Sequence, residues 1–266
     1  MDPFTPYKLN KKRPQNKNSQ ESKMHTEYHS WHSHRIGHEM RLKVYGHYGR
    51  PLLVFPCAGG TFHEFEDFGM LDIVREQVEQ GRLKVFCVDS IDNEAILRKD
   101  GHMGDNVYRH EAYDSYIVNE VAPFIRNHCQ SNCKIALTGN SMGAYHSVNF
   151  LLRHPDVFDA CIALAGIYSL RQVVGDYFDQ NVYFNSPVDY LPNLNDPWFL
   201  DQIRQARIII CTGQGAWEYP EDTYRLKQLF EEKGIPAWVD LWGHDVNHDW
   251  PWWKIMLPHF LPHILW

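Results

Sequence analysis

Residues 134–154, KIALTGNSMGAYHSVNFLLRH, decide how the chain folds. The run from Ile135 to Thr138 is apolar and β-prone, which predicts a strand. The pentapeptide Gly139-Asn140-Ser141-Met142-Gly143 follows at once. Beyond it, apolar residues recur at helical spacing as far as His154-Pro155. The segment therefore predicts a strand, a sharp turn and a helix.

The pentapeptide fits the pattern G-x-S-x-G, a turn that holds a nucleophilic serine above the carboxyl edge of a parallel sheet. The glycines are required because a Cβ two residues either side of Ser141 would collide with the neighbouring strand and helix. The turn also places Ser141 at a helix N-terminus, where the Met142 N–H favours negative charge on an attacked carbonyl oxygen. A serine that only caps the helix would give the same pattern, so other parts of the chain must distinguish a nucleophile from a cap.

Size and composition narrow the possible functions. The 266 residues, 44% of them hydrophobic, can bury one large core, and a single α/β domain is expected. A net charge of -7 without a basic block argues against a nucleic-acid partner. No apolar run reaches the length of a transmembrane helix, so no membrane partner is expected, and no signal-peptide pattern follows the first residue. The six cysteines lie mostly in strand-like runs, which favours free buried thiols and a cytoplasmic location.

The N-terminal segment differs in composition from the rest of the chain. Residues 1–23 are polar and basic, so they are expected to form a disordered tail before a folded domain over residues 24–266. Histidines then crowd into residues 25–38. Their spacing fits no helical metal motif, and the alternation places them on the solvent side of an edge strand, so no metal site is expected.

The rest of the chain alternates between strand and helix patterns. Strands are expected at residues 40–45, 51–55, 83–88, 135–138, 160–165, 207–212 and 237–241, with helices at residues 71–80, 111–127, 144–154 and 221–233 and a final helix ending near residue 263. This order predicts a mostly parallel sheet with helices on both faces. The alternation stops at residues 168–206, an aromatic-rich insert that is expected to form a small cap over the site.

Further residues supply what an acyl-transferring serine needs, a histidine base and a carboxylate that orients it. Ser141 follows one predicted strand, Glu218 a later one and His248 the last, the chain order that such a sheet requires. The glycine-rich loop after residues 51–55 is expected to supply a second oxyanion donor, Ala58 first and Gly59 next. This chemistry requires no metal ion and no cofactor.

Several stretches carry a resemblance to a known family: GNSMGAYHS, NSPVDYLP and HDWPWW, with FPCAGG and EFEDFGM. They resemble the putative esterase (esterase D-like) family of the α/β hydrolase superfamily, from about Tyr28 to the C-terminus. The resemblance implies the three-layer α/β hydrolase fold, Ser141 as the nucleophile and His248, the histidine of HDWPWW, as the general base. His244 stays open as an alternative base.

The acid is the position at which this chain departs from the family. The family commonly carries an aspartate three residues after the glycine that corresponds to Gly213, and this chain has Ala216 there. Glu218 is the nearest carboxylate and the first choice. The alternatives that stay open are Glu221, Asp222 and Asp245.

Three functions are compatible with these residues. The first is a serine carboxylic ester hydrolase that acts on a small or aromatic acyl ester through an acyl-enzyme intermediate. The second is an acyltransferase with the same triad, in which a bound alcohol replaces water. The third is a non-catalytic binding protein that keeps the fold. Such a protein should have lost the serine or the histidine, and both are present.

Overall fold

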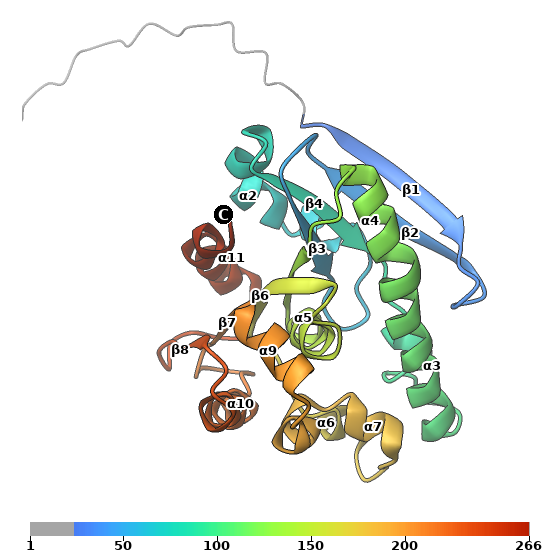
Figure 1. Cartoon of the computed structure of the whole chain (residues 1–266), viewed down its shortest axis with the longest axis vertical. Helices are drawn as coiled ribbons and strands as arrows, with labels where there is room; N and C mark the ends of the chain where they lie inside the picture. Colours follow the sequence, from blue (N-terminus) through green and yellow to red (C-terminus); the bar gives the residue numbers. More distant parts are fainter. Residues whose placement is uncertain (1–23, 266) are drawn as a thin grey trace, which may run out of the picture.

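The computed structural model describes residues 24–265, so the predicted tail lies outside the described residues. At its centre is an eight-stranded sheet with the order β1-β2-β4-β3-β5-β6-β7-β8 (Figure 1). The strands are β1 (Thr26–His32), β2 (Glu39–Tyr45), β3 (Arg50–Phe55), β4 (Leu83–Val88), β5 (Ile135–Asn140), β6 (Phe158–Leu164), β7 (Arg207–Thr212) and β8 (Ala237–Leu241). The pairs β1–β2 and β2–β4 are antiparallel and the other pairs are parallel, so the prediction of a mostly parallel sheet is confirmed.

Helices cover both faces of this sheet (Figure 1). They are α1 (Glu64–Asp67), α2 (Met70–Glu79), α3 (Met103–Tyr116), α4 (Ala122–Cys129), α5 (Met142–Arg153), α6 (Arg171–Val174), α7 (Gln180–Phe184), α8 (Pro187–Tyr190), α9 (Pro197–Gln205), α10 (Pro220–Lys233) and α11 (Trp250–Phe260), with short turns η1 (Asp92–Glu94), η2 (Ile117–Val121), η3 (Leu191–Asn193) and η4 (Leu261–Ile264). Alternate residues of a strand point to opposite faces. Leu52 and Val54 of β3 accordingly pack with α2 and α11, whereas Leu53 and Phe55 pack with α3, α4, α5 and α10. The three-layer α/β architecture is confirmed.

The helix expected over residues 111–127 begins earlier, at Met103, so that predicted boundary is wrong. The Nδ1 atom of His102 caps this start by accepting the Gly104 N–H at 3.1 Å. Gly104 and Asn106 are weak helix formers, which hides the first two turns from a propensity argument. Before Pro123 the helix widens into the π-helical turn η2, because proline has no N–H to donate and presses on the carbonyl four residues before it.

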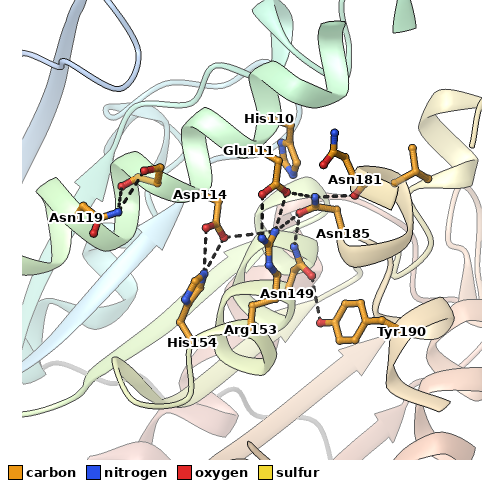
Figure 2. A network of polar contacts seen from close by, with 12 residues as sticks. His110, Glu111, Asp114, Asn119, Asn149, Arg153, His154, Asn181, Asn185 and Tyr190 are labelled. Atoms are coloured by element: carbon orange, nitrogen blue, oxygen red, sulfur yellow. Dashed lines mark hydrogen bonds and ion pairs between the residues drawn. The ribbon is translucent and has the colours of Figure 1, made fainter. Parts of the chain in front are cut away.

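A polar network fastens residues of the 168–206 insert to helices on the sheet (Figure 2). Arg153, the last residue of α5, donates to both carboxylate oxygens of Glu111 in α3, at 3.1 and 3.0 Å. Asn185 of the insert accepts from Arg153 and, at 3.0 Å, from the Asn149 amide of α5. Burial works against the Arg153 cation, but Asp114 and Glu111 outweigh it and raise its pKa. The insert is therefore held to α5 at the end farthest from Ser141.

We expect Arg153→Met to lower the free energy of unfolding by about 3 kcal/mol, because it leaves a largely buried carboxylate without its cation. Urea denaturation followed by circular dichroism measures this change. The matched control is Arg75→Met on α2, which removes a guanidinium that is 45% exposed and pairs with Asp72 and Glu79. That substitution should cost less than about 1 kcal/mol. Equal losses in the two variants would show that the network does not stabilise the fold.

Two smaller findings concern the apolar parts of the chain. Cys87, Cys161 and Cys211 are buried free thiols inside β4, β6 and β7. Within residues 24–265, no helix combines the length and the apolar character that a membrane span requires.

Candidate active site

The turn between β5 and α5 holds Ser141 in a strained backbone conformation, with φ 54° and ψ -119°. A Cβ on Gly139 would lie 2.4 Å from the carbonyl carbon of Gly143. A Cβ on Gly143 would lie 2.4 Å from the carbonyl oxygen of Phe55 in β3. Both approaches are too close for any side chain, so the turn requires glycine at these two positions.

Ser141 and His248 line the same cavity, which has a volume of about 200 Å³. The other lining residues are Met142, Ala165, Ile167, Trp217 and Tyr219. Over residues 24–265, the non-glycine residues with positive φ are Gln130, Ser141, Ala165 and Trp217. Three of these four line this cavity. Strained backbone that gathers around one cavity is typical of a functional site.

The walls of this cavity come from the loops after β5, β6, β7 and β8. The insert was expected to shape the pocket. Ile167, just before the insert, lines the cavity, but no described residue from 168 to 206 does. The aromatic side chains that do line it are Trp217 and Tyr219, which flank Glu218 in the chain.

Glu218 and His248 meet between the loop after β7 and the loop after β8. His248 Nδ1 lies 3.4 Å from Glu218 Oε2, and the same oxygen accepts the Thr212 hydroxyl at 3.0 Å. Catalytic hydrogen bonds are often this long before the Michaelis complex forms. The Glu218 side chain is 1% exposed, and its Oε1 has no hydrogen-bond partner within the described part of the chain. The His248 imidazole and the Thr212 hydroxyl are therefore the side-chain partners of this buried carboxylate.

The backbone of Ala216 positions the histidine. Its carbonyl accepts the His248 N–H at 3.0 Å, and its own N–H donates to the Asn247 side chain at 2.8 Å. The His248 ring also packs edge-on against Trp253, with the ring centroids 5.0 Å apart. The residue that stands where the family commonly has aspartate thus ties the two loops together, and the carboxylate two residues later reaches the imidazole.

None of the other acid candidates makes a hydrogen bond or ion pair with His248 within the described residues. Asp222 accepts the N–H groups of Tyr168 and Ser169, at 2.6 and 2.8 Å, so its carboxylate is committed to the start of the insert. Glu221 and Asp245 are exposed to solvent.

The alternative base, His244, makes no hydrogen bond to a carboxylate within the described residues. His244 is exposed, its Nδ1 lies 3.4 Å from the Gln214 carbonyl oxygen, and it does not line the cavity that Ser141 and His248 share.

The predicted oxyanion donors come from two segments: Met142 begins α5 and lines the cavity, whereas Ala58 follows β3 and does not line it. Met142 is the first residue of α5, so its N–H has no acceptor within the helix. The Ala58 N–H makes no hydrogen bond to the described residues, and neither does that of Gly59. The preceding Cys57 N–H is not free, because it donates to Glu64 Oε2 at 2.7 Å. Burial raises the pKa of Glu64, and the Cys57 N–H partly offsets this effect.

A second histidine–carboxylate pair lies beside the turn but not in the cavity. His146 of α5 and Asp92 of η1 approach to 3.1 Å, and both side chains are almost fully buried. Burial raises the pKa of Asp92, but its interactions with His146, His110 and Ser90 together outweigh burial, so the pKa is lowered. Neither residue lines the cavity, so this pair fastens η1 to α5.

Sequence reasoning missed several residues of the site. Thr212, which holds Glu218, is the last residue of a buried strand and resembles any other strand-end hydroxyl. Asn247, which holds Ala216, lies in the chain between His244 and His248, and both histidines are more obvious candidates for a catalytic role. Trp217 and Tyr219 could have been found, because placing Glu218 at the site also places its two neighbours near it.

The chain matches known proteins at two levels. The model of the family described as Putative esterase matches residues 33–264. None of the curated proteins compared with the chain matches it. Among solved structures, a ferulic acid esterase aligns with a TM-score of 0.70 at 17% identity, over 91% of this chain and 98% of its own.

Two S-formylglutathione hydrolases align as well. The one from Staphylococcus aureus gives a TM-score of 0.66 at 16% identity, over 91% of this chain and 97% of its own. The one from Agrobacterium tumefaciens gives a TM-score of 0.65 at 18% identity, over 90% of this chain and 94% of its own. At such identities these likenesses show a shared fold.

Proposed function

Because this chain belongs to the putative esterase family, we propose that it is a carboxylesterase-type serine hydrolase with Ser141, His248 and Glu218 as its catalytic triad. We propose further that it hydrolyses a small or aromatic acyl ester through an acyl-enzyme intermediate. The observation that carries the proposal is that the strained Ser141 and the Glu218-bound His248 line one cavity.

Each residue has a defined task in this mechanism. Ser141 Oγ attacks the ester carbonyl carbon while His248 Nε2 takes its proton. Glu218 accepts the Nδ1–H bond, which keeps Nε2 free to act as the base, and stabilises the imidazolium that forms. The N–H groups of Met142 and Ala58 bind the oxyanion of the tetrahedral intermediate. His248 then protonates the leaving alcohol, and water repeats the sequence to release the acid and Ser141.

The cavity favours a small acyl group with an aromatic contact at its rim. A volume of about 200 Å³ accommodates a short acyl chain. Trp217 is 88% exposed and Tyr219 58% exposed, so both rings are accessible to an incoming ligand. A structural neighbour is a ferulic acid esterase, which supports an aromatic acyl group in the proposal.

Hydrolysis of p-nitrophenyl acetate, butyrate and benzoate by the purified protein tests this proposal. We expect turnover of all three, and Trp217→Ala should raise KM for the benzoate by about tenfold, which corresponds to the loss of roughly 1.4 kcal/mol of aromatic contact. KM for the acetate should stay within twofold. The matched control is Trp238→Ala, which removes a partly exposed tryptophan of β8 that does not line the cavity. If none of the esters is turned over, the triad assignment fails.

The alternative acyltransferase requires an acceptor site that excludes water. The exposure of Trp217 and Tyr219 at the cavity favours water as the acceptor instead. Product analysis with added methanol or glycerol distinguishes the two reactions, because a transferase would form the new ester in preference to the free acid.

A further inference from the structure

Three imidazoles surround one carboxylate at the edge of the sheet. His25 and Glu27 precede His29 at alternate positions, so their side chains share one face of this edge. His25 Nε2 lies 2.7 Å from Glu27 Oε1, and His29 Nε2 lies 3.0 Å from Glu27 Oε2. His128, near the end of α4, reaches that second oxygen from the other side at 3.1 Å. The cluster therefore joins β1 to α4.

The spacing of the donor atoms suits a metal ion. Glu27, His29 and His128 each offer one ligand atom, and these three atoms all lie within 4.8 Å of one another. Tetrahedral coordination at 2.0–2.1 Å separates its donor atoms by about 3.4 Å, so side-chain shifts of at most about 1.4 Å would admit the ion. Two imidazole nitrogens and one carboxylate oxygen form a donor set that Zn²⁺ commonly uses.

Aromatic packing holds the two imidazole rings in place. Phe124 of α4 packs edge-on against His29, with the centroids 4.9 Å apart. Phe86 of β4 packs in the same way against His128, at 5.6 Å. The side chains of Glu27, His29 and His128 are 31%, 30% and 15% exposed, so the cluster is shielded and still open to an ion from solvent. Ligands that are already oriented lose little freedom when an ion binds.

We propose that Glu27, His29 and His128 form a binding site for a divalent transition-metal ion, best suited to Zn²⁺, with His25 or water at the fourth position. His128 precedes β5, whereas Ser141 follows it, so the two sites lie at opposite edges of the parallel strands. The ion would therefore cross-link β1 to α4 and take no part in ester hydrolysis. The spacing of the histidines in residues 25–38 predicted no metal site, and it could not include His128, which stands 101 positions after Glu27.

Calorimetric titration of the EDTA-treated full chain with Zn²⁺ tests this site. The absorption spectrum of bound Co²⁺ provides an independent measure of metal binding. We expect one ion per chain and a thermal midpoint that rises with Zn²⁺. Glu27→Gln, His29→Ala and His128→Ala should each weaken binding by at least about 100-fold and abolish the thermal shift. Each variant should keep the far-ultraviolet circular dichroism spectrum and the p-nitrophenyl acetate rate of the metal-free wild type.

The matched control is the double variant His32→Ala/His34→Ala. These rings lie 5.9 Å apart in the same histidine-rich segment, and neither bonds to a carboxylate within the described residues. The double variant should bind Zn²⁺ like the wild type. The proposal is overturned if the wild type binds no ion. It is also overturned if binding survives Glu27→Gln and His128→Ala but is lost in the double variant, which would show adventitious binding by surface histidines.

Discussion

Ser141→Ala is expected to lower kcat for p-nitrophenyl acetate by roughly 10⁴- to 10⁶-fold, as loss of a triad nucleophile does. We expect the variant to lose the chemical step and to keep the fold, because alanine needs no more space than serine and the glycines that permit the turn are unchanged. Residual hydrolysis would come from the oxyanion donors and from substrate binding. Steady-state kinetics with circular dichroism as a folding check measure the effect.

Two further variants sharpen this result. His248→Ala should lose a similar factor, and adding it to Ser141→Ala should cost little more, since residues that act as a unit are not additive. His244→Ala is the matched control, four positions away and outside the cavity, and should stay within twofold of the wild type. A Ser141→Ala variant that retained wild-type turnover would mean that the reaction occurs elsewhere.

Glu218→Gln is expected to lower kcat by roughly 10⁴-fold, the effect of the corresponding change in other triads. Glutamine keeps the volume of the buried side chain, and its amide NH2 group can take the position of Oε2, which faces both His248 Nδ1 and the Thr212 hydroxyl. It cannot stabilise the imidazolium, and its amide N–H favours the wrong tautomer of His248. The same kinetic assay, run with thermal unfolding, separates this loss from a loss of stability.

The matched control for this acid is Glu221→Gln, which removes an exposed carboxylate from the first turn of α10 and should leave kcat within twofold. A fall of less than about tenfold in Glu218→Gln would show that the site works as a Ser141–His248 dyad. The substitution of Ala216 for the family aspartate would then be a true loss of the acid.

The parts of the fold that sequence reasoning predicted are those that depend on neighbouring residues. The strands around residues 52, 86 and 137 are continuous apolar runs because both faces of the sheet are covered, and such runs are visible without knowing what covers them. The Ser141 turn was predictable for the same reason, since its steric requirements lie within five residues. The start of α3 was not, because His102 stabilises it against weak propensity.

The candidate site shows the same division. Chain order placed Ser141, Glu218 and His248 on loops at one sheet edge, the resemblance to the family favoured His248 over His244, and the structure puts Glu218 within reach of His248. Their supports were not predictable, since Thr212 and Asn247 act through single hydrogen bonds across loops. The convergence of His128 on the edge strand likewise depends on how α4 crosses the sheet. Contacts between distant segments leave no local pattern.

The loop after β7 constrains how this enzyme can evolve. In the proposed mechanism, the buried Glu218 serves catalysis while its exposed neighbours Trp217 and Tyr219 meet the substrate. An insertion or deletion in the loop would displace the acid together with the recognition surface. We therefore expect new substrate preferences to arise by point replacements at the two aromatic positions without a change in loop length, and we expect homologues with a longer loop to carry their acid elsewhere.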